Sequence, residues 1–140
     1  MEPVVGEERL IVATLDHRRV REERQNFDPA GTGRNVTLFN CFVMGTIPDN
    51  LPGIFEHLRE AAVTLQQGGG VGMDFSTIRP AGAAVKGVGA EASGPLSFMD
   101  TWDAMCRTIM SAGQRGGAMM GCLRIDHPDI EDFIDAKRDG

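Results

Sequence analysis

The chain has 140 residues, the length of a single domain at most, and its 41% hydrophobic and 24% charged residues are ordinary for a globular protein. A net charge of −6 and an isoelectric point of about 5.0 argue against an electrostatic surface for nucleic acid, although a small basic pocket for a phosphate stays open. No apolar run has the length of a transmembrane helix, and the first residues lack the pattern of a secretory signal. We therefore expect a cytoplasmic protein that binds neither nucleic acid nor membranes.

The first 29 residues differ in texture from the rest of the chain. The apolar run LIVATL has no clear period and predicts a short strand or helix. The run HRRVREERQ mixes charges of both signs and predicts a solvated helix without chemistry. We treat residues 1–29 as a separate N-terminal segment and residues 30–140 as the domain that carries the function.

From residue 30 onward the pattern becomes sharper. The segment NVTLFNCFVM, Asn35–Met44, is rich in β-branched and aromatic residues between glycines and predicts a buried strand. A helix is expected next, over about residues 50–67, with Asp49 as its candidate N-cap and a run of glycines after its end. Its apolar residues recur at helical spacing, as one stripe formed by Ile54, Leu58, Ala61, Ala62 and Leu65.

The second half continues the alternation of strands and helices. VGMDFSTI predicts a short strand, RPAGAAVKGVGAEASG a loop, and residues 95–112 a helix that opens with Pro95. AMMGCLRI predicts another strand, and a third helix starts at His127-Pro128. The charged residues of this last helix suit its dipole: Asp129, Glu131 and Asp132 at its start, Lys137 and Arg138 at its end. Strands alternating with helices predict an α/β fold with parallel pairing.

The cysteines and histidines predict no metal site. Cys41, Cys106 and Cys122 are widely spaced without a CxxC pair, and the three histidines lie far apart in the sequence. Each cysteine lies among apolar residues and by itself resembles a small buried hydrophobe. One face of the second helix is apolar and indicates core or interface; it holds Phe98, Trp102, Met105, Cys106, Ile109 and Met110.

A glycine-rich stretch, Leu65–Pro95, contains only two cationic side chains, Arg79 and Lys86. It is neither a dinucleotide fingerprint, because a helix precedes its glycines, nor a GxxxxGK[ST] phosphate loop. Its glycines allow close backbone approach to a ligand, or simply form a loop. Arg79 and Lys86 suit a triphosphate clamp and equally suit two solvated charges. Arg115, between glycines in GQRGG, has the same two interpretations.

Four motifs together resemble the catalytic subunit of ribonucleotide reductases, and within that family the adenosylcobalamin-dependent class II. They are NVTLFNCFVMGTIPDNL, LQQGGGVGMDFSTIRPAGAAVKGVG, ASGPLSFMDTWDAMCRTIMSAGQRGGAMMG and DHPDIEDFIDAKRDG. The resemblance covers about residues 30–140, and residues 1–29 are divergent. It implies that the chain is an early internal piece of the family's ten-stranded α/β barrel.

The resemblance also implies roles for residues near the substrate. Cys41 matches a redox-active thiol that, with a partner far downstream, supplies two electrons and becomes a disulfide. Asn40 stands beside it, where a related class often has serine, as a substrate contact. Gly69 and Gly70 match backbone that closes over the ribose and phosphate of the substrate.

A second set of roles concerns allosteric control. The loop from Arg79 to Gly94 looks like the family's first specificity loop. Asp49, Arg79 and Lys86 match residues that hold a deoxynucleoside triphosphate, Asp49 through the ribose and the cations through the phosphates. The segment 111–118, with Arg115, looks like the second loop, between the effector and the substrate base. The two longer helices resemble a pair that joins a homodimer, which would account for their methionine- and tryptophan-rich stripes.

The implied activity is radical reduction of ribonucleoside di- or triphosphates to deoxyribonucleotides for DNA synthesis. Adenosylcobalamin would be the cofactor, although no cobalamin-binding motif occurs here, and a thioredoxin- or glutaredoxin-like dithiol would be the reductant. The family's thiyl motif, NxCxE, and the partner of Cys41 are absent from this sequence. We therefore expect a partial chain that is inactive by itself. Two alternatives are a non-catalytic dNTP-binding or dimerisation module, and a truncated product that does not fold stably.

Overall fold

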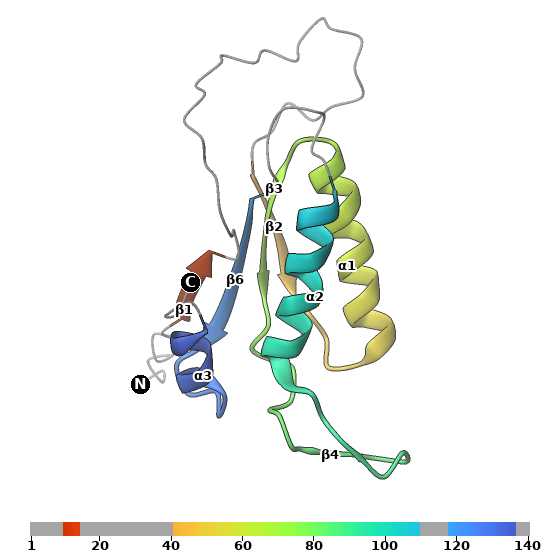
Figure 1. Ribbon diagram of the computed structural model, residues 1–140, viewed down its shortest axis with the longest axis vertical. Helices are drawn as coiled ribbons and strands as arrows, with labels where there is room; N and C mark the ends of the chain where they lie inside the picture. Colours follow the sequence, from red (N-terminus) through yellow and green to blue (C-terminus); the bar gives the residue numbers. More distant parts are fainter. Residues whose placement is uncertain (1–9, 15–40, 110–117, 137–140) are drawn as a thin grey trace, which may run out of the picture.

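The computed structural model describes residues 10–14, 41–109 and 118–136 (Figure 1). Three expected features lie outside these ranges: the charged helix predicted from HRRVREERQ (residues 17–25), the first part of the strand predicted over 35–44, and the basic end of the third helix. The described elements are β1 (Leu10–Thr14), β2 (Cys41–Thr46), α1 (Leu51–Gln66), β3 (Gly70–Asp74), β4 (Ala84–Val85), β5 (Ala90–Glu91), α2 (Gly94–Thr108), β6 (Met119–Arg124) and α3 (Ile130–Asp135).

The larger sheet has the strand order β1-β6-β3-β2. The strands β2, β3 and β6 are parallel neighbours connected through α1 and α2, whereas β1 pairs antiparallel with β6. The expected α/β fold with parallel pairing is confirmed. Because the three strands are parallel, their first residues share one end of the sheet and their last residues share the other. We call these the amino end, with Cys41, Gly70 and Met119, and the carboxyl end.

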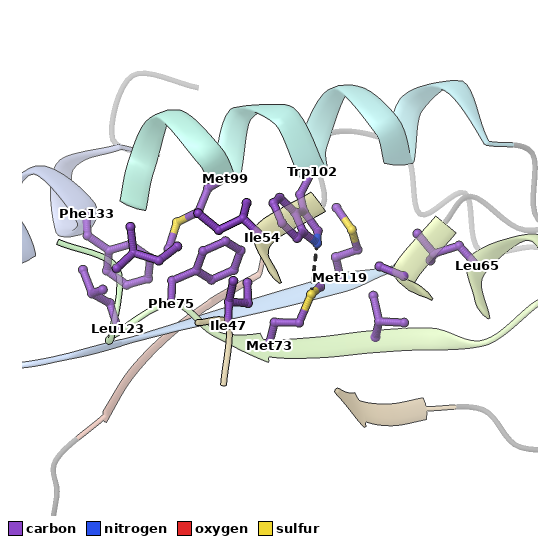
Figure 2. Packing of buried hydrophobic residues seen from close by; sticks show 13 residues of the cluster. Ile47, Ile54, Leu65, Met73, Phe75, Met99, Trp102, Met119, Leu123 and Phe133 are labelled. Carbon is purple, nitrogen blue, oxygen red and sulfur yellow. Dashed lines mark hydrogen bonds between the residues drawn. The ribbon is translucent and has the colours of Figure 1, made fainter. Parts of the chain in front are cut away.

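Helices α1 and α2 lie side by side against one face of the parallel strands (Figure 1). The core forms between them and the sheet, and Figure 2 shows α2 directing Met99 and Trp102 toward side chains of β3 and the turn after it. The Trp102 indole N–H donates to the Met73 sulfur at 3.0 Å. The Trp102 ring meets Phe75 edge-on, with centroids 5.4 Å apart.

The apolar stripes of both helices belong to this core. Met99 and Trp102 are buried, and α1 buries Ile54, Ala61 and Leu65 of its predicted stripe. The core interpretation of the α2 stripe is thus confirmed for Trp102. The expectation that a dimer contact accounts for Trp102 is wrong, because this side chain is fully buried within its own chain. No helix in the described part combines the length and apolarity that a bilayer crossing requires.

The strand β2 is less buried than its composition suggested. None of its residues is buried, and Val43 is 91% exposed. The first reason is that β2 is the edge strand of the described sheet. The second reason is that Val43 lies on the face of the sheet that turns away from α1 and α2, in one row with its partner Gly72 and with Met120, the partner of Gly72. Cys41 shares this alternation and is exposed too. We call this side, with Cys41, Val43 and Met120, the open face.

The N-cap of α1 is Asn50 rather than Asp49. The Asn50 side chain accepts a hydrogen bond from the Gly53 amide at 2.8 Å, as a capping residue does. The following Pro52 occupies the first turn, where no N–H is needed. The predicted Asp49 cap is therefore wrong by one residue, and the Asp49 carboxylate is available for a different contact.

Candidate functional site

The amino end of the sheet brings Cys41 next to Gly70. The two residues are direct partners in the β2–β3 register, so the thiol lies beside a strand position without a side chain. The neighbouring Gly69 is buried, and a Cβ atom there would come within 2.7 Å of the Phe42 ring. Glycine is thus required at position 69 by packing between the two strands. The structure places Cys41, Gly69 and Gly70 together, as their shared assignment to a substrate site requires.

Two further members of the predicted substrate set, Asn40 and Arg115, lie outside the described residues. The described residues that flank the second predicted loop are Ile109, after α2, and Ala118, before β6. The Ala118 carbonyl accepts from the Val71 amide at 3.1 Å. Ala118 therefore lies at the amino end of the sheet, the end at which Cys41 lies.

The carboxyl end carries a polar cluster that sequence reasoning missed. The Asp74 carboxylate accepts from the Ser76 amide at 2.9 Å and from the Ser76 hydroxyl, and the Thr46 hydroxyl donates to it at 3.4 Å. Cys122 pairs with Asp74 across the sheet. Burial, and secondly the Asp74 charge, raise the pKa of the Cys122 thiol. An acid followed closely by serine after a strand, DFS, was the available signal.

The three cysteines cannot pair with one another. All three lie in the described ranges and none forms a disulfide. On β3, the partner of Cys41 is Gly70 and the partner of Cys122 is Asp74. These two partners are four residues apart along the strand (70 to 74). At about 3.3 Å per residue this places the two thiols about 13 Å apart along the sheet, beyond the reach of a disulfide. Cys106 packs against the core from α2, away from the open face.

We expect the exposed Cys41 to react with iodoacetamide several-fold faster than Cys122 at pH 8, as measured by mass spectrometry of the labelled peptides. A raised pKa leaves less thiolate at a given pH, so labelling of Cys122 should be slow and should accelerate as the pH climbs. The variant Asp74→Asn removes the negative charge and should speed labelling of Cys122 without changing Cys41. Equal rates for both thiols across pH 7 to 9 would contradict this assignment.

At the other end of the sheet, Asp49 and Arg79 form an ion pair. The Arg79 Nε donates to an Asp49 carboxylate oxygen at 2.8 Å, and the Arg79 amide donates to the other at 3.3 Å. Each side chain keeps about a third of its surface exposed, at 35% and 32%. Two residues predicted to hold one effector are therefore in direct contact, although 30 positions separate them in the sequence. The Arg79 Nη1 also donates to the Ala84 carbonyl at 3.5 Å, and the guanidinium donors that neither partner uses can still meet a ligand.

Lys86 lies apart from this pair. The segment predicted as loop contains a small hairpin of β4 and β5, which projects from the body of the domain (Figure 1). Lys86 is exposed near its tip, beside Gly87 and Gly89, whose φ angles of 88° and 65° suit glycine alone. Among the described residues, no hydrogen bond or ion pair joins Lys86 to Asp49 or Arg79. The structure thus unites two of the three effector candidates.

Comparisons with known proteins place this geometry in a family. A family model described as "Ribonucleotide reductase, barrel domain" matches residues 39–140. The vitamin B12-dependent ribonucleoside-diphosphate reductase of Mycobacterium tuberculosis is 45% identical over 100 residues, which are 71% of this chain and 14% of the relative. The enzyme of the same name from Thermoplasma acidophilum is 42% identical over 97 residues, 69% of this chain and 12% of the relative.

Relatives whose names do not mention vitamin B12 match as well. The ribonucleoside-diphosphate reductase subunit alpha of Helicobacter pylori is 34% identical over 101 residues, 72% of this chain and 13% of the relative. The solved structure of the Actinobacillus ureae class Id ribonucleotide reductase alpha subunit superposes with a TM-score of 0.60 at 30% identity, covering 74% of this chain and 18% of that one.

The chain therefore spans about an eighth of the length of the curated relatives it matches. The predicted likeness to the B12-dependent class is confirmed, since relatives at 45% and 42% identity carry that name. The predicted barrel fold is confirmed by the family match, which begins at residue 39. The boundary drawn at residue 30 stays a prediction. This chain belongs to the ribonucleotide reductase family, of whose barrel domain it forms a part.

Proposed function

We propose that this chain contributes one reducing thiol and one regulatory nucleotide site to a ribonucleotide reductase, which makes deoxyribonucleotides for DNA synthesis. The observation that carries the proposal is the position of Cys41, exposed on the open face directly beside Gly70. A thiol there can meet a substrate ribose that approaches the amino end of the sheet. The substrate would be a ribonucleoside di- or triphosphate, and Asn40, Gly69, Gly70 and Arg115 would line its site.

The proposed reaction is a two-electron reduction. The ribose 2′-hydroxyl leaves as water and is replaced by hydrogen, while two thiols give up two electrons and two protons and become a disulfide. Cys41 would be one of these thiols. Cys122 is too far from Cys41 along the sheet, and Cys106 packs against the core on the other side of the sheet, so the second thiol would come from outside this chain. By itself, therefore, the chain should not turn over substrate.

Resetting Cys41 requires a reductant. A thioredoxin- or glutaredoxin-like dithiol would reduce the disulfide by exchange, and this reaction needs an accessible pair of sulfur atoms. We place the protein in the reducing cytoplasm, where cysteines are kept as thiols between turnovers.

The names of the B12-dependent relatives support adenosylcobalamin as the cofactor that starts the radical chemistry. The described residues contain no group of three or more His, Cys, Asp or Glu side chains that could hold a metal ion. The cofactor's binding residues would therefore lie elsewhere in the reductase, and we derive no step of the mechanism through it.

The Asp49–Arg79 pair would form the core of the effector site. A deoxynucleoside triphosphate would bring phosphates to Lys86 and to the guanidinium donors of Arg79 that Asp49 and Ala84 do not use, and a ribose hydroxyl to the Asp49 carboxylate. The hairpin that carries Lys86 would have to approach the pair. A homodimer through α1 and α2 is compatible with the exposed Leu51 and Phe55, one turn apart on α1.

A second candidate function is a nucleotide-binding module without catalysis. One observation favours it: the Asp49–Arg79 ion pair forms within this chain and needs no residue from outside it. The two functions agree on the effector site and differ on Cys41. Only the reductase function requires its thiol.

Calorimetric titration of dTTP into the chain tests the effector site. We expect Arg79→Ala to weaken binding by about tenfold or more, because a hydrogen bond to a charged group contributes roughly 1.5–3 kcal/mol. Lys86→Ala should weaken it less, since a flexible exposed ammonium makes no fixed fork. Arg59→Ala is the matched control: it removes the same charge from an exposed pair with Glu56 on α1.

Equal affinity in the Arg79→Ala and Arg59→Ala variants would overturn the effector assignment. Inorganic triphosphate, titrated in parallel, separates phosphate binding from recognition of the nucleoside. If the unmodified chain binds neither ligand, the module function fails and the reductase function rests on Cys41 alone.

A further inference from the structure

The turn after β6 lies against the loop that carries Arg79. The His127 side chain, only 7% exposed, makes a 2.9 Å hydrogen bond through Nε2 to the Ile78 carbonyl. Its Nδ1 accepts from the Asp129 amide at 3.1 Å. Because a carbonyl oxygen only accepts, Nε2 is the donor in the bond to Ile78. His127 thus connects its own turn to the residue immediately before Arg79.

Asp129 makes a second connection to the same loop. It occupies the N-cap position of α3, yet its side chain makes no capping bond to that helix. Instead its Oδ2 accepts from the Ala81 amide at 2.9 Å, across 48 positions of sequence. Ile78 and Ala81 bracket Arg79, so the backbone of Arg79 is held on both sides by one short turn.

The same carboxylate also meets the start of α2. Gly94 has a φ of +79°, and a Cβ atom there would lie 2.8 Å from both the Asp129 Oδ2 and the Ala81 nitrogen. Ala81 begins the segment that contains the β4–β5 hairpin, and Gly94 ends it. Both stems of the loop that bears Lys86 therefore converge on Asp129.

We propose that Asp129, braced by His127, is a positioning residue for the anion site centred on Arg79. This inference rests on the proposed effector site. Arg79 has a long side chain with many rotamers, and a fixed backbone lowers the entropy lost when its guanidinium engages a ligand. The turn also keeps the Arg79 amide on Asp49, so that the ion pair holds one geometry. Asp129 itself does not touch the ligand.

The test compares three variants of the full chain. Asp129→Ala removes the acceptor of the Ala81 amide, whereas Asp129→Asn keeps an oxygen acceptor and restores it. Asp132→Ala is the control, because it removes the same charge from the exposed first turn of α3. Two readouts are measured for each: the amide hydrogen exchange of Ala81 and Arg79 by NMR, and the affinity for dTTP.

We expect Asp129→Ala to raise exchange at Ala81 and Arg79 several-fold and to weaken dTTP binding about tenfold, the order of effect of one lost hydrogen bond beside a charged site. Asp129→Asn and Asp132→Ala should stay within about twofold of the unmodified chain. The Val71 amide, bonded to Ala118 inside the sheet, reports global destabilisation and should not change.

Other outcomes overturn the inference. If amide exchange at Ala81 is unchanged in Asp129→Ala, or if exchange at Val71 rises equally, Asp129 does not hold the Ala81 backbone locally. Faster exchange at Ala81 and Arg79 with unchanged dTTP affinity would show that Asp129 holds the backbone but does not position Arg79 for the ligand. If the unmodified chain binds no dTTP, the effector proposal fails separately, and the exchange at Arg79 still decides whether Asp129 fixes its backbone.

Discussion

Replacing Trp102 by alanine is expected to lower the free energy of unfolding by about 3–5 kcal/mol, the usual cost of deleting a large buried aromatic side chain. Trp102 is 0% exposed and lies between α2 and β3. Its ring meets Phe75 edge-on, and its N–H bonds the Met73 sulfur. Truncation would leave a cavity at the contact that holds α2 on the sheet.

Urea unfolding followed by far-ultraviolet circular dichroism measures the effect. Trp102→Phe should cost distinctly less, because it keeps a ring against Phe75 and loses only the N–H and part of the volume. Val88→Ala is the surface control, since Val88 is 74% exposed at the hairpin tip, and it should change stability by less than about 0.5 kcal/mol. A loss below about 1 kcal/mol in Trp102→Ala would show that α2 does not depend on this contact.

Substituting Gly94 by alanine is expected to destabilise the chain by about 3 kcal/mol. Part of this cost, roughly 1–2 kcal/mol, comes from the positive φ, which L-residues adopt with strain. The remainder comes from the contact of the new methyl group with the Ala81 nitrogen and the Asp129 carboxylate, each 2.8 Å from its position. Because one contact atom belongs to the backbone, the junction has to open.

Gly82→Ala is a matched control for this substitution. Gly82 has a nearly identical φ of +77°, but no atom lies within 4 Å of its Cβ position. The difference between the two variants in urea unfolding therefore isolates the close contact from the backbone strain. Equal destabilisation by both substitutions would mean that the junction of Ala81, Gly94 and Asp129 has room for a methyl group.

Elements with a strong periodic pattern were predictable from the sequence. The stripe of α1 and the strand in AMMGCLRI result from burial against one face, which imposes a regular spacing on apolar residues. The N-cap of α1 was misplaced because Asp49 and Asn50 are adjacent and both residue types cap helices. The exposure of Val43 was not predictable, because an edge strand with an open face and a buried strand share the same composition.

The site shows the same division. The family resemblance predicted that Asp49 and Arg79 lie close together. The parallel β2–α1–β3 unit supplies the physical reason for their contact, because it brings the carboxyl ends of its two strands to one edge. The contact of Asp129 with the Ala81 amide could not be read from the sequence. An acid at the start of a helix is already explained by the helix dipole, so nothing local indicates that its carboxylate serves a loop 48 positions away.

The placement of Trp102 has an optical consequence. It is the single tryptophan in the sequence, and its indole lies in an apolar environment with its N–H on a sulfur atom (Figure 2). Emission excited at the tryptophan band therefore comes from one site, at the seam between α2 and the sheet. The helix α2 begins at the Gly94 junction and ends where the segment with Arg115 starts. The fluorescence of Trp102 can therefore report movement at either end of α2 without an added dye.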